Sequence, residues 1–367
     1  MNEKKRIEWL DAMRGFTMLM VVAYHTELMA FQETEKTSAA MSLLVLFRMP
    51  LFFFVSGFLA YRSRFEWTVP NTVSLLWKKV RVQVVPTLVF LCAFIVIRRT
   101  DFTHSFMEAM KSPTKGGYWF TLVLLQMFFI YYLFAFAEQR LGWKEKSWRW
   151  VPVTLFWAAS LVAYETAYMP KVFTYPKSDF MTYSSLIQTV RYMHFFLLGN
   201  IVHRYWRAAQ RVFDHPCFFP ALALAAFVCC SDFLRWHTLR LTWTNLPRTL
   251  GMYGTMLTVV LFFRHYQSSF TKDRPLGAFL QYVGTRTLDV YLLHYIFMPK
   301  LPFVGEWLNA NRPNFVVSVT LSLAVALVVT AFCLLTSNIL RISPFYSEHL
   351  FGRKADAPKT RQENYKS

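Results

Sequence analysis

The chain has 367 residues, of which 55% are hydrophobic and 18% aromatic, and its formal net charge is +19. Long apolar runs recur from Leu10 to Leu340, which excludes an ordinary soluble domain. The positive charge does not indicate a nucleic-acid-binding protein, because the basic residues lie in short loops rather than on one basic domain. The five cysteines show no metal-ligand or disulfide spacing, so we expect packing roles and no metal site.

Ten apolar segments follow one another along the chain, each close to the roughly 20 residues needed to cross a bilayer. Backbone polar groups in lipid must be satisfied within the segment, so these segments are predicted to be helices. The predicted helices are 10–30, 41–61, 80–97, 118–137, 150–168, 183–203, 217–234, 247–264, 279–299 and 314–340. The predicted fold class is an all-α, polytopic membrane protein, with a transmembrane domain at 1–340 and a polar cytoplasmic tail at 341–367.

Lysine and arginine predict the orientation of these helices, since cytoplasmic loops carry more of them. One set of loops holds 24 of the 40 basic residues and the alternate set holds 12. The richer set contains both ends of the chain: 2–8, 61–81, 138–149, 203–215, 264–275 and the tail from 341. Both termini are therefore predicted to be cytoplasmic, which agrees with an even number of spans.

The first predicted span carries ionisable residues at membrane depth, where charge usually marks a pair, a pathway or a site. Arg14 and His25 are eleven residues apart, which is about three helical turns and about 16 Å along one face. Asp11 precedes Arg14 by three residues and can pair with it. Two structural alternatives are an Arg14 that reaches the membrane surface and a His25 that only bonds a neighbouring helix.

The second and third segments add further candidates. Ser56 precedes Gly57 in the second segment, where small residues permit close approach of two helices. Lys78 and Arg81 share a helical face at the predicted cytoplasmic mouth of the third segment, where a phosphate-bearing ligand would approach. The alternative for Ser56 is ordinary helix packing with no role in a site. The alternative for Lys78 and Arg81 is the ordinary excess of basic residues on the cytoplasmic side. Trp119, at the start of the fourth segment, is typical of an interfacial anchor.

The ninth segment contains a second polar set. Arg286 and Asp289 form an i,i+3 pair, and Tyr291 and His294 follow. His294 lies towards the predicted outer side, as His25 does. His294 could have a structural role or take part directly in the chemistry, and the sequence leaves both alternatives open.

Several motifs occur together in order from about residue 7 to 340. They are Leu10-Asp11…Arg14-Gly15, Arg14-x10-His25, Phe52-Phe53-Phe54-Val55-Ser56-Gly57-Phe58, Lys78-x-x-Arg81 with Pro86, Trp119-Phe120, Phe196-Leu197-Leu198-Gly199 and Gly284…Tyr291-Leu292-Leu293-His294. The ordered set resembles the acyltransferase-3 family of bacterial membrane acyltransferases. Two positions depart from the family pattern: Lys78 stands where an arginine is common, and Asp289 where small hydroxyl residues are common.

The resemblance implies a ten-helix core in the bacterial cytoplasmic (inner) membrane. It implies an acyl-CoA donor, commonly acetyl-CoA, reached from the cytoplasm, and an acceptor hydroxyl on an extracytoplasmic glycan or lipid-linked glycan. His25 would be the catalytic histidine with Arg14 as its partner, and Lys78 and Arg81 would lie near the donor. Asp11, Ser56, Trp119, Arg286, Asp289, Tyr291 and His294 are possible supporting residues. We expect no permanently bound cofactor, no metal and no nucleic-acid partner.

Two mechanisms fit a histidine at position 25. A neutral imidazole could take the proton of the acceptor hydroxyl, or it could carry the acyl group transiently. The rival hypothesis for the whole chain is a transporter or flippase of an envelope precursor, in which the intramembrane charges form a translocation path. That hypothesis accounts for the charges but not for the ordered motifs.

Overall fold

The computed structural model describes residues 7–35, 37–98, 101–167, 179–235, 246–311 and 315–351, and within these ranges it contains helices and no strand. The predicted all-helical class is therefore confirmed for the described residues. The helices of the first half are α1 (Glu8–His25), α2 (Ala39–Ala60), α3 (Val69–Lys79), α4 (Val85–Arg98), α5 (Phe102–Lys111), α6 (Trp119–Arg140) and α7 (Trp150–Ala167). Those of the second half are α8 (Asp179–Tyr183), α9 (Leu186–Arg204), α10 (Trp206–Phe213), α11 (Phe218–Arg235), α12 (Leu246–His265), α13 (Pro275–Thr285), α14 (Thr287–Phe297), α15 (Pro302–Asn311), α16 (Phe315–Leu340) and α17 (Pro344–Phe351). Short π or 3₁₀ turns are η1 (Thr26–Ala30), η2 (Val80–Val84), η3 (Lys115–Gly117), η4 (Trp143–Glu145) and η5 (Gln267–Phe270).

Four helices in the described part of the chain are long and apolar enough to cross a membrane. They are Ala40–Ala60, Val69–Arg98, Trp119–Arg140 and Val316–Leu340, and each overlaps one of the predicted segments. Helix α1 is buried along most of its length, but Glu8, Asp11 and Arg14 make its first half polar. The total of ten membrane spans and the cytoplasmic location of both termini stay predictions.

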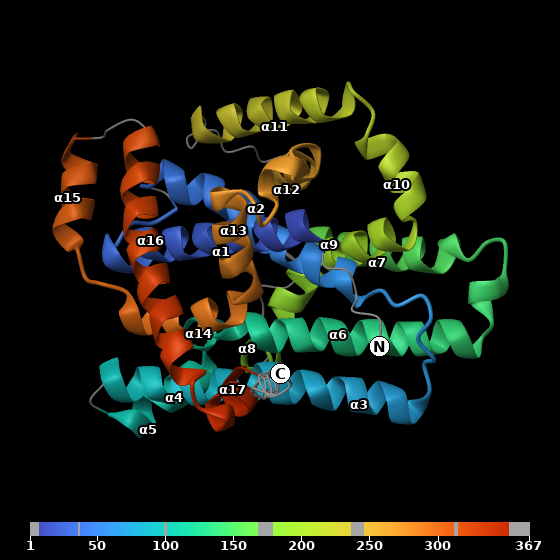
Figure 1. Ribbon diagram of the computed structural model, residues 1–367, viewed down its shortest axis with the longest axis horizontal. Helices are drawn as coiled ribbons and strands as arrows, with labels where there is room; N and C mark the ends of the chain where they lie inside the picture. Colours follow the sequence, from blue (N-terminus) through green and yellow to red (C-terminus); the bar gives the residue numbers. More distant parts are fainter. Residues whose placement is uncertain are drawn as a thin grey trace, which may run out of the picture.

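The first helix lies at the centre of the molecule. It packs against α2, α12, α13, α14 and α16, and Figure 1 shows α1 and α2 between α11 at one edge and α3, α4 and α6 at the opposite edge. A Cβ on Gly15 would overlap the backbone carbonyl of Leu280, and a Cβ on Gly284 would overlap that of Asp11. Glycine at both positions lets α1 and α13 pack backbone to backbone, which holds the polar first half of α1 beside the start of α14.

A second close approach joins α2 to α9. A Cβ on Gly57 would overlap the backbone carbonyl of Phe196, and a Cβ on Gly199 would overlap that of Phe54. The close helix approach predicted at Ser56-Gly57 is present at Gly57, and the supporting role of Ser56 stays a prediction. The contact packs the C-terminal half of α2 against α9.

The third apolar helix begins at Val69 rather than at residue 80, and it continues through α3, η2 and α4 to Arg98. The Thr68 side chain caps its start by accepting a hydrogen bond from the backbone N–H of Asn71. The predicted boundary was wrong, because this polar first part of the helix lacks the apolar character used to place it. Lys78 and Arg81 therefore lie on one continuous helical rod.

The ninth predicted helix, 279–299, is two helices rather than one. Arg286 leaves helical geometry, with φ −119° and ψ 23°, between α13 and α14. The break lets α13 pack on α1 while α14 turns to pack on α16 and α4. In the predicted tail, α17 is ordered and packs near α4 and η2, whereas residues 352–367 lie outside the described residues.

Candidate active site

A cavity of about 660 Å³ runs beside the central helix, which is within the size range of ligand pockets, about 300–1,000 Å³. Its walls come from α1, α2, α3, η2, α6, α9 and α14, together with the loop before α6. Arg14 and His25 both line it, as their predicted shared face requires. Because they are about 16 Å apart along α1, the cavity spans at least that length.

At one end of the cavity, His25 meets two residues of α14. Nδ1 of His25 lies 3.2 Å from Nε2 of His294, and Nε2 of His25 lies 3.2 Å from the hydroxyl of Tyr295. His294 is fully buried and does not line the cavity, whereas His25 and Tyr295 do. The last turn of α1 and the last turns of α14 therefore build this end together.

The partners of His294 assign the tautomers of both imidazoles. Nδ1 of His294 faces the backbone carbonyls of Val290, at 3.1 Å, and Tyr291, at 2.8 Å. A carbonyl only accepts, so this nitrogen carries the hydrogen, and Nε2 of His294 is left as an acceptor. His25 must then donate from Nδ1, which leaves the lone pair on its Nε2. A neutral His25 thus presents a basic nitrogen on the side of Tyr295.

The Tyr295 hydroxyl lies between two acceptors. It is 3.0 Å from the carbonyl oxygen of Gly117 and 3.2 Å from Nε2 of His25. When His25 is neutral, the tyrosine can donate to either atom; when Nε2 is protonated, the tyrosine oxygen can accept from it. Tyr295 can therefore partner both protonation states of His25.

The loop before α6 presents the Gly117 carbonyl. The hydroxyl of Tyr291 also donates to this oxygen, at 3.1 Å, and accepts from the backbone N–H of Phe120. Gly117 has φ +104°, and a Cβ there would overlap the ring of Tyr295. Only glycine satisfies both the backbone conformation and the contact with Tyr295, so this loop and α14 fit together as one unit.

The other end of the cavity holds Arg14 among polar partners. Its guanidinium is 3.1 Å from a carboxylate oxygen of Asp11 and donates to the Thr287 hydroxyl at 3.2 Å. Thr287 is the first residue of α14, directly after the break at Arg286. The predicted Asp11–Arg14 pair is thus present, and it is tied to the start of α14.

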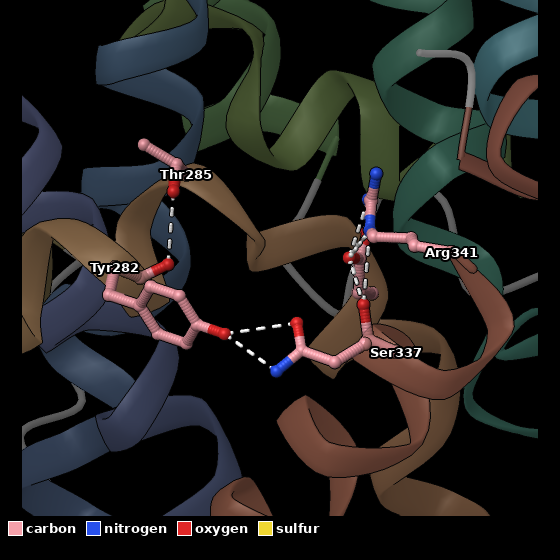
Figure 2. Close-up of polar contacts among 6 residues, drawn as sticks. Tyr282, Thr285, Ser337 and Arg341 are labelled. Atoms are coloured by element: carbon pink, nitrogen blue, oxygen red, sulfur yellow. Dashed lines mark hydrogen bonds and ion pairs between the residues drawn. The ribbon is translucent and has the colours of Figure 1, made fainter. Parts of the chain in front are cut away.

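Near Arg14, α14 also meets the end of α16. The Asp289 carboxylate accepts from the Ser337 hydroxyl at 2.6 Å and from the Arg341 guanidinium at 2.6 Å. Figure 2 shows Ser337 and Arg341 directed at one shared partner, with Tyr282 bonding a different residue. Arg341 lines the cavity, although its position was predicted to begin the polar tail. Asp289 therefore holds a cavity arginine in place.

The cavity is rich in positive charge. Its lining includes six cationic side chains, which are Arg14, Arg48, Arg62, Lys79, Arg191 and Arg341. The acidic side chains in the lining are Glu35 and Asp289, and Asp289 is already paired with Arg341. A cavity with this balance is suited to an anionic ligand.

The predicted residues divide into those that line the cavity and those that do not. Besides Arg14 and His25, the lining includes Ser56, Trp119, Asp289 and Tyr291. Asp11 and His294 contact lining residues from behind. Arg286 lies outside the lining, where its guanidinium stacks 3.9 Å from the ring centroid of Tyr282.

The predicted donor-binding pair is not brought to the cavity. Lys78 and Arg81 are exposed, and neither is in the lining. Lys79 lines the cavity instead, with its Nζ 3.8 Å from the ring centroid of Phe128. The spacing of basic residues alone favoured Lys78 and Arg81, because it cannot tell which face of the rod turns inward.

Residues of the site that were missed from the sequence include Tyr295, Lys79, Arg62 and Arg341. Tyr295 adjoins the motif residue His294, so a search for hydroxyl donors beside the motif could have found it. Arg341 had no such signal, since a basic residue after an apolar helix is typical of an ordinary membrane boundary.

The fold and the cavity are those of a helical membrane protein with a cation-lined site built around an imidazole. Residues 7–337 match the family model of an acyltransferase domain, and the chain belongs to this family, the acyltransferase-3 family. No curated protein and no solved structure matches the chain. The protein is therefore a membrane acyltransferase, and the transporter hypothesis is not favoured.

Proposed function

We propose that this protein is an O-acetyltransferase that moves the acetyl group of cytoplasmic acetyl-CoA to a hydroxyl of an envelope glycan or related extracytoplasmic acceptor. We place it in the bacterial cytoplasmic membrane with ten spans and both termini inside. The observation that carries the proposal is the shared cavity, which has Arg14 at one end and the basic nitrogen of His25 at the other. A long anionic donor can lie between these two points.

The donor's phosphates are proposed to bind at the Arg14 end. Arg14, Arg62, Lys79 and Arg341 line the cavity, and Arg14 and Arg62 lie within electrostatic range of Lys79. Guanidinium groups suit phosphate oxygens because they offer parallel donors. The exposed Lys78 and Arg81 are proposed to attract the donor towards the opening. The thioester would then reach His25 through the length of the cavity.

His25 is proposed to act as the general base. Its Nε2 takes the proton from the acceptor hydroxyl as the hydroxyl oxygen attacks the thioester carbonyl. The tetrahedral intermediate collapses with cleavage of the carbon–sulfur bond, and the proton on Nε2 passes to the departing CoA sulfur. His294 supports the transient imidazolium by accepting from Nδ1–H, and Tyr295 accepts from Nε2–H.

The test is transfer of labelled acetyl groups in membranes. Membranes containing the wild-type protein are incubated with acetyl-labelled acetyl-CoA, and the envelope glycan is then extracted and counted. We expect His25→Ala to remove the label from the glycan. His104→Ala is the matched control, because His104 is exposed on α5 and does not line the cavity. Full labelling by the His25 variant, with normal amounts of protein in the membrane, would exclude the proposed role.

A further inference from the structure

Arg48 is a buried cation that the acetyl-transfer step does not use. Its side chain lies on α2, is 8% exposed and lines the cavity. Its guanidinium carbon lies 3.4 Å from the centroid of the Tyr24 ring. Among the described residues, none of the ion pairs includes Arg48, and its buried Nε has no hydrogen-bond partner. A buried charge of this kind is costly unless a counter-charge is supplied.

The acidic residue that lines the same region is engaged elsewhere. Glu35 accepts from the Tyr24 hydroxyl at 3.2 Å and lies 3.9 Å from the guanidinium of Arg248. Its side chain is 47% exposed, so water also screens it. Among the described residues, the ion pair of Glu35 is with Arg248 and not with Arg48, so a ligand in the cavity can supply a direct counter-charge.

Arg48 lies at the His25 end rather than at the end proposed for the donor's phosphates. It stacks on Tyr24, the neighbour of His25. From Arg48 to the end of α2, next to Arg62, the helix advances about 18 Å. A donor whose phosphates bind around Arg14 and Arg62 cannot also place them on Arg48 while its thioester reaches His25. The other substrate, the acceptor, is the one available to Arg48.

The same cavity also has an aromatic wall. Phe52, Trp119, Phe120 and Tyr192 line it. The rings of Trp119 and Tyr192 are stacked, with centroids 5.9 Å apart and planes 19° apart. Flat aromatic surfaces with a polar edge suit a ligand that has an apolar face and hydroxyl groups, as a sugar ring does. Arg191, at the start of α9, adds a second cation to this wall.

We propose that Arg48 binds an anionic group of the acceptor, a carboxylate or a phosphate, so that the acceptor is an acidic saccharide. This inference rests on the proposed function, because it assumes that the ligand at the His25 end is the group that receives the acyl chain. It adds the substrate class: a sugar whose ring lies on the aromatic wall and whose negative charge contacts Arg48.

Binding of three matched sugars tests the proposal without turnover. Glucose, glucuronic acid and glucose 6-phosphate share one ring and differ at C6 in charge and in the type of anion. Their affinities for the full-length protein in lipid nanodiscs are measured by equilibrium dialysis with labelled sugar. Saturating CoA is present, so that the phosphate sites at the Arg14 end are occupied. The readout is the ratio of anionic to neutral affinity.

We expect at least one anionic sugar to bind about tenfold or more tightly than glucose, as expected for one charge-assisted hydrogen bond. Preference for glucuronic acid would identify a carboxylate, and preference for glucose 6-phosphate a phosphate. Arg48→Gln should bring the ratio close to one, and Arg48→Lys should keep part of it. Arg62→Gln is the matched arginine control: it should weaken CoA binding and leave the sugar ratio unchanged.

Three results would overturn the proposal. The first is equal affinity for the neutral and anionic sugars, including the absence of measurable binding by all three. The second is an anionic preference that survives Arg48→Gln in protein that still binds CoA. The third is loss of CoA affinity in Arg48→Gln with an unchanged sugar ratio, which would assign Arg48 to the donor. None of these readouts depends on acetyl transfer, so they are independent of the His25 test.

Discussion

Nε2 of His294 lies 3.2 Å from Nδ1 of His25, although the two residues are 269 positions apart in the chain. The contact connects the end of α1 to two backbone carbonyls of α14 through a single buried imidazole. It assigns the basic lone pair of His25 to Nε2, at the cavity. His294 is therefore a positioning residue for the proposed base.

Replacement of His294 should lower turnover while leaving donor binding intact. We expect His294→Ala to reduce kcat by about 10- to 100-fold, a smaller loss than removal of the base itself. His294→Gln should recover part of this loss, because the amide oxygen of glutamine can accept from Nδ1–H of His25. Steady-state kinetics with acetyl-CoA separate kcat from KM. An equal loss in the alanine and glutamine variants would contradict the hydrogen-bond role.

Removal of the Tyr295 hydroxyl should affect catalysis more than stability. We expect Tyr295→Phe to lower kcat by about tenfold, since a hydrogen bond to a charged group contributes about 1.5–3 kcal/mol. Tyr291 still donates to Gly117, so the loop keeps a partner. Tyr118→Phe is the control: its hydroxyl donates to the Leu292 carbonyl away from the cavity. That variant should lose thermal stability and retain kcat; the reverse pattern would contradict the assignment.

The general-base and acyl-carrier mechanisms differ in whether an acetylated His25 forms. If His25 acts as a base, incubation with acetyl-CoA and no acceptor leaves its imidazole unmodified. We expect rapid acid quenching followed by mass spectrometry of the peptide that contains His25 to show no added acetyl group. An acetylated His25 that disappears when acceptor is added would establish the carrier mechanism instead.

Two adjacent lysines offer a matched comparison of donor binding. Lys79 lines the cavity and Lys78 is exposed. We expect Lys79→Gln to raise KM for acetyl-CoA by about tenfold, as loss of one charge-assisted contact would. Lys78→Gln should have a smaller effect that disappears at high salt, because it acts at long range. A larger, salt-independent effect at Lys78 would favour the prediction made from spacing alone.

The ion pair between Asp289 and Arg341 should behave as a coupled pair. The two side chains are 3% and 14% exposed, with 2.6 Å between their nearest atoms. Because each single change leaves one buried charge without its partner, Asp289→Asn and Arg341→Gln should each destabilise the protein, by up to about 3–5 kcal/mol. The double variant should lose less than the sum of the two. Melting of detergent-purified protein measures this, and additive losses would show that the pair is not coupled.

The positions of the long helices follow from local properties of the sequence. A helix in lipid must stay apolar over about 20 residues, and Ala40–Ala60, Trp119–Arg140 and Val316–Leu340 carry that signal in their own composition. The start at Val69 and the break at Arg286 were missed for different reasons. The first turns of α3 are capped locally by Thr68 but are too polar for a criterion of apolar length. The break at Arg286 changes direction inside an apolar run, and the helices that pack on α13 and α14 fix it.

The residues of the site divide in the same way. Arg14 and His25 were paired from their spacing, since two positions on one helix keep their relation in any fold. Lys79, Arg341 and Tyr295 could not be assigned, because their roles depend on which face of each helix turns inward. The preference for Lys78 over Lys79 illustrates this, since the two differ by one residue and by about 100° around the helix.

By itself, the sequence determined that this protein is helical, lies in a membrane and carries Arg14 and His25 on one face of its first helix, and its ordered motifs identified the family. These are properties of short segments or of residues with a fixed spacing. Only the tertiary structure decided that His294 orients His25, that Tyr295 and Gly117 complete that end, and that Arg48 is buried without an acidic partner among the described residues. These relations join helices that are distant in the chain, and packing of the glycines on α1, α2, α9 and α13 sets where those helices meet.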